Sequence, residues 1–337
     1  MNTREEREEM QLKRRGLLIY FSAGIIVLAI SLGILAGCKR SSITIPTTPY
    51  TAASTPEDKI SAYENPAAVI TVEELNRIQD ASNLVILDAR AANGKDYRIN
   101  FKGGHIPGAS GFMRSQYTDS ARWNRVARAT QVQRYFREMG IDNYSRIVLY
   151  DNGNGRAGRV YWMLLMHGCE NQVQILDGGI DKWKEAGYQL SNERTNRGSA
   201  KFSFNKAKAD PGLTTEFKEI GEASSTPDDP GKIVVDARSA DEYTKGHIAN
   251  SVNVGVDEIL NPDKTFKPLH ELNSIFAAKG VTPDKNVYVY SNYGGRSSLV
   301  WFVLHELMGY STVKNFDAGL KEWGYREKPL VKGTPNV

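Results

Sequence analysis

The chain has 337 residues, of which 43 are lysine or arginine and 39 are aspartate or glutamate, and its formal net charge is +4. This length predicts two domains, each large enough to bury a core without disulfides, and the modest net charge argues against a nucleic-acid partner. There are only two cysteines, Cys38 and Cys169, which excludes a disulfide scaffold and a cysteine-rich metal site, so we expect neither a metal nor a cofactor.

Residues 1–38 predict an export signal. A Lys-Arg-Arg run precedes residues 16–37, an uncharged apolar stretch that is long enough to cross a bilayer as a helix. Basic residues on its amino-terminal side predict that this end stays in the cytoplasm while the rest of the chain is exported. The stretch ends in Leu-Ala-Gly-Cys38, which resembles a bacterial lipobox. That resemblance implies cleavage before Cys38 and attachment of lipid to its sulfur.

The alternative is an uncleaved membrane anchor that contains Cys38 by chance. Both interpretations place the following residues at the bacterial cell membrane, on its extracytoplasmic side, and we expect the lipid-anchored form. Residues 39–65 are rich in Ser, Thr and Pro, which predicts a flexible tether with no core of its own.

Beyond the tether, the chain contains an internal duplication. Four sequence blocks occur twice, in the same order and at nearly constant spacing. The first copies are LVILDAR (84–90), GGHIPGA (103–109), 146–164 and 175–183, and the second copies are IVVDAR (233–238), KGHIANS (245–251), 286–304 and 315–323.

The duplication predicts two similar α/β domains. Within each copy, a short continuous apolar run is typical of a strand buried on both faces of a parallel sheet. A later run of this kind leads into a glycine-rich turn and then a helical pattern, which predicts a doubly wound fold. The expected parts are domain 1 (66–190), a polar linker (191–212), domain 2 (213–327) and a tail (328–337).

The repeated blocks resemble the rhodanese family of thiosulfate sulfurtransferases. The resemblance rests on Asp-Ala-Arg after a strand, then Gly-His-Ile, then a strand that enters a glycine loop, then Asp-Gly-Gly-x-x-x-Trp, found in full or in near form in both copies. It implies two tandem rhodanese-like domains, each a parallel sheet flanked by helices. It also implies that domain 1 is non-catalytic and that domain 2 carries the catalytic loop.

The family loop begins with a nucleophilic cysteine, and neither copy has one. The domain 2 loop reads Ser291, Asn292, Tyr293, Gly294, Gly295 and Arg296. Ser291 stands at the family's cysteine position, where a hydroxyl cannot carry a persulfide and loses its proton far less readily than a thiol. We therefore expect that Ser291 is not a nucleophile and that sulfur transfer is absent.

The glycines and Arg296 of this loop still suit an anion. Backbone N–H groups at the start of a helix form a nest for negative charge, and an arginine adds a charged donor. Ser291 could donate a hydrogen bond to a bound oxyanion such as thiosulfate. The alternative is that the loop is a relic of the fold without a ligand.

The equivalent loop of domain 1 runs from Asp151 to Arg156. The Asp151 carboxylate would compete with an incoming anion, and Arg156 is expected to pair with it and close the site. Cys169 follows a helix and precedes a strand, so we expect a buried, inert thiol. The alternative is that Cys169 replaces the missing nucleophile.

Three further features are interpreted as structural. Asp88 and His105 are expected to form a hydrogen-bonded corner rather than an acid–base pair. Asp177 begins a turn that needs the conformational freedom of glycine. Residues 122–137 are basic with aromatics, and we expect the solvated face of a helix there.

Three functional hypotheses follow. The first is a non-catalytic rhodanese relative that binds a small oxyanion, a sulfur species or a protein partner that the sequence does not identify. The second is an active sulfurtransferase, as the resemblance implies. The third is a purely structural interaction module at the cell surface.

Overall fold

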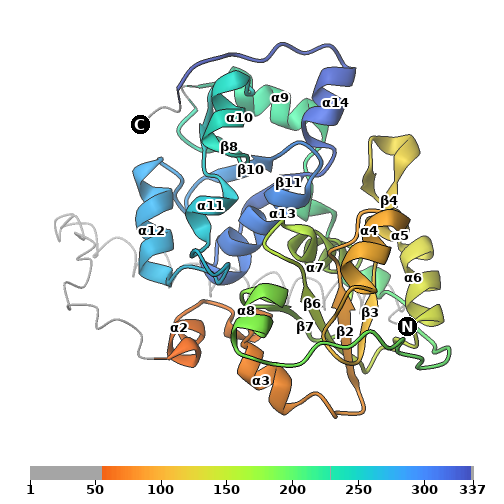
Figure 1. The fold of residues 1–337 in the computed structure, drawn as a ribbon. Coiled ribbons are helices and arrows are strands. Elements are labelled where there is room, and N and C mark those ends of the chain that lie inside the picture. The colour runs from red at the N-terminus through yellow and green to blue at the C-terminus, as the bar shows by residue number, and fades with distance from the viewer. Residues whose placement is uncertain (1–54, 228, 335–337) are drawn as a thin grey trace, which may run out of the picture. The chain divides into compact units, whose positions relative to one another are not determined.

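The computed structural model of the protein describes residues 55–227 and 229–334 (Figure 1). The expected export signal, Cys38 and most of the expected tether lie outside the described residues. Within the described part, each repeat forms its own parallel β-sheet. No helix of the described part is long and apolar enough to span a membrane.

The first repeat contains a five-stranded sheet in the order β1-β7-β6-β2-β3, and all neighbouring strands are parallel. Its strands are β1 (Val69–Ile70), β2 (Leu84–Asp88), β3 (Ala109–Gly111), β6 (Arg146–Tyr150) and β7 (Val173–Leu176). The helices around it are α3 (Val72–Arg77), α4 (Gly94–Asp96), η2 (Tyr97–Phe101), α5 (Arg114–Tyr117), α6 (Ala129–Glu138), α7 (Arg156–Met166) and α8 (Gly179–Glu185). A hairpin consists of β4 (Thr118–Asp119), η3 (Ser120–Arg122) and β5 (Arg125–Val126).

The second repeat contains a four-stranded parallel sheet in the order β11-β10-β8-β9. Its strands are β8 (Lys232–Asp236), β9 (Ser251–Asn253), β10 (Asn286–Tyr290) and β11 (Val313–Phe316). The surrounding helices are α9 (Phe217–Ser225), α10 (Ala240–Lys245), α11 (Val256–Ile259), α12 (Leu269–Ala278), α13 (Gly295–Phe302), η6 (Val303–Leu307) and α14 (Gly319–Tyr325).

The register confirms the predicted duplication and the predicted α/β fold. Asp88 pairs with Tyr150 in the first sheet, and Asp236 pairs with Tyr290 in the second. Strand β2 is buried along its whole length, as its apolar run predicts. Because parallel strands end at the same edge of a sheet, the loops after β6 and β10 lie at the carboxyl edge, where α/β folds bind ligands.

The Asp-Ala-Arg blocks form buried corners. Arg90 contacts Asp88 at 2.6 Å and also donates to the carbonyl oxygen of Gly104 at 2.8 Å, while Tyr150 donates its hydroxyl to Asp88 at 2.8 Å. The rings of His105 and Phe101 stack with centroids 3.8 Å apart. These groups are fully occupied by the fold, which agrees with the structural interpretation.

The segment before the first repeat is more ordered than a flexible tether. Helix α2 (Pro56–Ser61) begins after Thr55, which caps it, and the side chain of Ile60 is buried. Lys59 forms an ion pair with Asp177 at 2.5 Å, and Tyr63 donates its hydroxyl to the carbonyl oxygen of Lys267 at 2.9 Å. Residues 55–65 thus contact both repeats, because apolar and charged anchors follow the Pro-rich stretch.

The linker and the tail also pack on the repeats. Phe202 and Phe204 of the linker are buried, and both rings contact Phe136. The linker continues through η4 (Lys206–Lys208) and η5 (Pro211–Leu213). In the tail, Val331 donates its N–H to the carbonyl oxygen of His247 at 2.9 Å.

Helices α7 and α13 pack against each other where the two repeats meet. A Cβ atom at Gly158 would lie 2.9 Å from the Cα of Leu299, so the absence of a side chain permits the contact. A Cβ atom at Gly155 would likewise lie 2.5 Å from the carbonyl oxygen of Gly295. The amino-terminal ends of the two helices, and the loops that precede them, therefore face a common space.

Candidate anion-binding site between the two repeats

The loop of the first repeat is filled by its own carboxylate. Asp151 accepts hydrogen bonds from the N–H of Gly153 at 2.7 Å and the N–H of Ala157 at 2.9 Å, and its side chain is buried. Burial raises the pKa of Asp151, while the backbone hydrogen bonds act in the opposite direction. The nest of backbone amides thus already holds an anion that belongs to the chain.

The expected pairing of Arg156 with Asp151 is not formed. Arg156 instead donates to the carbonyl oxygen of Arg90. The backbone amides satisfy the carboxylate directly, so Arg156 is left without a carboxylate partner among the residues that the structure describes. Its charge remains available to the space between the repeats.

Ser291 is held inside its own loop. Its Oγ accepts from the N–H of Gly294 at 3.1 Å and donates to the Oγ of Ser297 at 3.2 Å, and only 1% of the residue is exposed. An activated serine needs a neighbouring general base. The hydrogen bonds of Ser291 within the described chain include neither a histidine nor a carboxylate.

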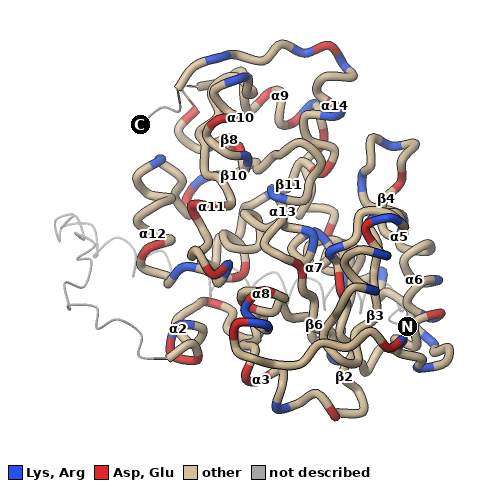
Figure 2. Tube along the Cα trace, in the orientation of Figure 1, with Lys and Arg blue, Asp and Glu red and all other residues tan. Residues whose placement is uncertain are grey.

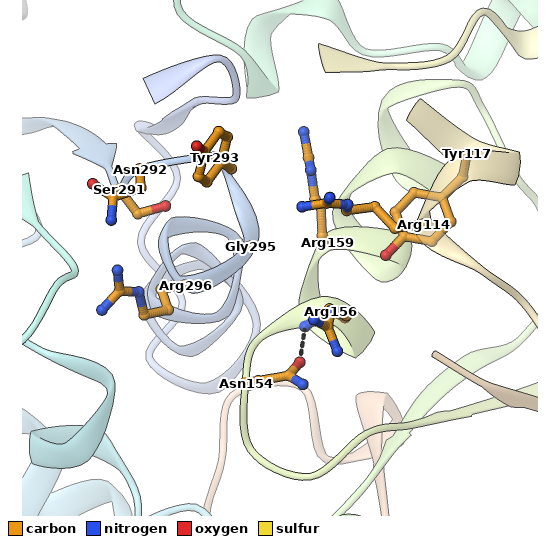
Figure 3. Close-up of a pocket in the computed structure, with 10 residues that line it drawn as sticks. All are labelled: Arg114, Tyr117, Asn154, Arg156, Arg159, Ser291, Asn292, Tyr293, Gly295 and Arg296. Atoms are coloured by element: carbon orange, nitrogen blue, oxygen red, sulfur yellow. Dashed lines mark hydrogen bonds between the residues drawn. The ribbon is translucent and has the colours of Figure 1, made fainter. Parts of the chain in front are cut away.

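Arg296 lines the same space, but Glu242 of α10 compensates its charge. Two nitrogens of Arg296 donate to the Glu242 carboxylate, one of them at 2.9 Å, and Asn292 also donates to it at 2.9 Å. The hydrogen bond from Arg296 lowers the pKa of Glu242 to about 2. Figure 3 shows the Arg296 guanidinium pointing away from Arg156 and Arg159.

A cavity of about 160 Å³ lies between the two loops. Ser291, Asn292, Tyr293, Gly295 and Arg296 line it from the second repeat, and Arg114, Tyr117, Asn154, Arg156 and Arg159 line it from the first (Figure 3). Of the four arginines that line the cavity, Arg114 and Arg156 form no ion pair with a carboxylate of the described chain. Arg159 forms a buried ion pair with Asp317 at 2.6 Å.

Tyr117 gives this cavity an unused hydrogen-bond donor. The residue is fully buried, and its hydroxyl has no hydrogen-bond partner among the residues that the structure describes. Burial raises the pKa of Tyr117 to about 12, so the hydroxyl keeps its proton. Its oxygen points into the space beside Arg114 and Arg159 in Figure 3. Buried polar groups are rarely left unpaired, and an anion in the cavity would satisfy this one.

The sequence analysis missed Arg114, Tyr117 and Arg159. Arg114 and Tyr117 lie in a segment that the four repeated blocks do not include, so the duplication drew no attention to them. Arg159 left a usable signal, because it is a single charged residue in an apolar helical stretch and such residues are buried only when paired.

Cys169 is unsuited to replace the missing nucleophile. Burial raises the pKa of its thiol to about 11, and its sulfur contacts the Oδ1 of Asn171 at 3.5 Å. Cys169 follows the far end of α7, whose 11 residues extend about 16 Å. Among the described residues, no group of three or more His, Cys, Asp or Glu side chains could hold a metal ion.

Comparisons with known proteins agree with the geometry. The family model of the rhodanese-like domain matches residues 71–186 and 219–325. A relative from Saccharopolyspora erythraea, named "Putative thiosulfate sulfurtransferase", is 32% identical over 242 residues, covering 66% of this chain and 83% of the relative. The "Sulfur carrier protein TtuD" of Thermus thermophilus is 31% identical and covers 68% of this chain and 86% of the relative.

Among solved structures, the anaerobic ergothioneine biosynthesis enzyme from Chlorobium limicola has a similar fold. Its TM-score is 0.69 at 22% identity, covering 81% of this chain and 72% of that chain. Two family domains in sequence order, two parallel sheets and relatives matched over most of their length all lead to one assignment. The chain belongs to the tandem-domain rhodanese family of thiosulfate sulfurtransferases.

Proposed function

We propose that this protein binds a small oxyanion in the cavity between its two rhodanese-like domains and does not transfer sulfane sulfur. The observation that carries the proposal is the combination of Ser291, which has no neighbouring base, with an unsatisfied donor, Tyr117. Tyr117 lines the same cavity as Arg114 and Arg156, which form no ion pair in the described chain.

The state of Ser291 supports the loss of transfer. Persulfide chemistry requires a thiolate, which forms a sulfur–sulfur bond with the donor. Position 291 provides a hydroxyl, and that hydroxyl is already held between Gly294 and Ser297. No step of the family reaction can begin there, because neither the sulfur atom nor a base is present.

The positive side of the cavity supports anion binding. Arg114 and Arg156 contribute charge from the first domain, and Tyr117 contributes a neutral donor. Gly295 and Arg296 at the start of α13 line the same space from the second domain, and the positive end of a helix dipole favours negative charge. A volume of about 160 Å³ suits an ion of few atoms rather than a larger metabolite.

Calorimetric titration of thiosulfate and of sulfate into the full-length chain in detergent tests this proposal. We expect saturable binding that weakens about tenfold or more in Arg114→Gln, since a charged hydrogen bond contributes roughly 1.5–3 kcal/mol. Arg98→Gln is the matched control, because this exposed arginine carries the same charge outside the cavity. Absence of saturable binding would refute the proposal and favour a purely structural module.

The Ser291→Cys variant tests separately the second part of the proposal, that the protein does not transfer sulfane sulfur. A cysteine thiolate at this position would take the outer sulfur atom of thiosulfate and release sulfite. We expect the variant, but not the native chain, to gain the mass of one sulfur atom. Turnover by the native chain in a thiosulfate–cyanide assay would contradict the proposal.

An active sulfurtransferase is the second candidate, favoured by the names that the relatives carry. In this chain, such an activity would have to use Cys169, whose raised thiol pKa opposes it. Cys169→Ser separates the two functions, because activity that disappears in this variant would support the second candidate.

We also propose that the chain is exported and held at the extracytoplasmic side of the membrane by lipid on Cys38. The lipobox-like sequence and the apolar stretch before it support this proposal. Metabolic labelling with an alkyne fatty acid should mark the native chain and leave Cys38→Ala unmarked. Equal labelling of both would refute lipidation at this residue.

A further inference from the structure

A second hollow lies on the first domain, outside the cavity between the domains. It is a groove of about 730 Å³ bounded by strand β3, by the end of α6 and by linker residues 194–197. We propose that this groove binds an extended acidic segment of a partner protein, which pairs with β3 as an additional strand. The proposal does not depend on anion binding between the domains.

The backbone of β3 has a free edge in this groove. Strand β3 is the last strand of its sheet and pairs only with β2. Phe112 donates its N–H to the carbonyl oxygen of Asp88 at 2.8 Å. Successive peptide groups of a strand point to opposite sides, so the N–H and C=O of Gly111 point away from β2. An edge of this kind can pair with another extended chain.

The opposite wall of the groove carries uncompensated positive charge. Within the described chain, the guanidinium groups of Arg194 and Arg197 have neither an ion pair nor a hydrogen bond. Glu138, which also lines the groove, is 3.9 Å from Arg134. Figure 2 shows lysines and arginines on α6 and on the chain beside it. The excess of positive over negative charge in the groove favours an occupant that carries carboxylates.

The remaining lining is apolar and adaptable. Met113 and Met139 line the groove with flexible thioethers, which suit surfaces that accept varied side chains. The ring of Tyr97 lies against Gly111, where any side chain would collide with it. An occupant that alternates apolar and acidic residues would place one set near the methionines and the other near the arginines.

The two domains differ at this edge. Asn253 of the second domain occupies the register position of Gly111, since it pairs with Asp236 as Gly111 pairs with Asp88. The Asn253 side chain donates to the carbonyl oxygens of Asp236 at 2.9 Å and Arg238 at 2.8 Å. The groove of the first domain is completed by the interdomain linker, which is not part of the repeated unit.

Fluorescence anisotropy with a labelled peptide, Val-Glu-Val-Asp-Val-Glu-Val, tests the proposal on the full-length chain in detergent. We expect saturable binding that weakens about tenfold or more in an Arg194→Gln/Arg197→Gln double variant. Lys206→Gln/Lys208→Gln is the control, because it removes the same charge from the same linker outside the groove. Hydrogen exchange of the Gly111 amide should slow when the peptide is bound.

Three outcomes would overturn the proposal. The first is equal affinity of the native chain and the arginine double variant. The second is equal affinity for a peptide whose backbone nitrogens are all methylated, because such a peptide cannot donate to the Gly111 carbonyl. The third is full displacement of the peptide by an equal concentration of free glutarate, which would make the groove a site for small carboxylates.

Discussion

Val126 of the first domain donates its backbone N–H to the Oδ2 of Asp317 in the second domain at 2.6 Å. Phe266 of the second domain donates its N–H to the Oδ1 of Asp177 in the first domain at 2.7 Å. Each domain thus extends a chain segment to the aspartate that opens the other domain's Asp-Gly-Gly or Asp-Ala-Gly turn. These two aspartates connect the two domains, and the sequence analysis interpreted Asp177 only as a turn residue.

Asp317→Asn should destabilise the protein strongly. The change leaves Arg159 buried without its carboxylate, and breaking one side of a buried ion pair costs roughly 3–5 kcal/mol. A lower urea midpoint for unfolding is the expected measurement. Asp119→Asn is the control, because the ion pair of Asp119 with Arg122 is partly exposed. Equal urea midpoints for both variants would show that the Arg159–Asp317 ion pair contributes nothing to stability.

Tyr117→Phe should separate stability from binding. The native hydroxyl has no partner, so its removal should leave the unfolding free energy unchanged or raise it by about 1 kcal/mol. The same variant should bind thiosulfate or sulfate more weakly. Tyr150→Phe is the contrasting control. The Tyr150 hydroxyl donates a hydrogen bond to Asp88, so its removal should lower the free energy of unfolding. A Tyr117→Phe protein with native affinity would remove this hydroxyl from the site.

Glu242 should make stability sensitive to acid. Its pKa is lowered from 4.5 to about 2 in the folded chain, mainly by the hydrogen bond from Arg296. As the pH falls, the unfolded state therefore takes up a proton before the folded state does. The contribution of Glu242 to stability is complete above about pH 4.5 and is lost as the pH falls to about 2. Glu242→Gln should show a smaller loss of Tm across this window. An identical pH profile in both proteins would contradict the pairing.

Cys169 should react slowly with iodoacetamide. With a thiol pKa of about 11, its thiolate fraction at pH 8 is roughly 200-fold lower than that of an ordinary cysteine of pKa about 8.5. The measurement uses a Cys38→Ser chain, so that Cys169 is the one thiol present. Unfolding in urea should restore ordinary reactivity. Fast labelling of the folded chain would revive Cys169 as a candidate nucleophile.

The sequence was sufficient for the fold because the strands left a local signal. Runs such as residues 84–87 are apolar throughout, and the repeated blocks place the strand ends and the two loops. The position of Ser291 followed from the same alignment of blocks. These features depend on neighbours in the chain, so they can be read without knowledge of the tertiary contacts.

The partners of the site residues were not accessible in this way. Arg296 is compensated by Glu242, which lies 54 positions earlier in the chain. Arg156 turned to the carbonyl oxygen of Arg90 because Asp151 was satisfied by backbone amides. Likewise, residues 122–137 were expected to form the solvated face of a helix, yet α6 begins only at Ala129 and Arg125 reaches Glu322 at 2.7 Å. Such pairings depend on tertiary contacts between segments far apart in the chain, which local sequence does not encode.

Gly158 sets the spacing between α7 and α13 next to the cavity, although it does not line the cavity. A single methyl group at this position would press on the backbone of α13 at Leu299 and act as a wedge between the domains. The spacing of Arg114 and Arg156 from the amides of the opposite loop would widen with it. A position with room for nothing larger than hydrogen would thereby set, from a distance, the size of ion that the proposed site admits.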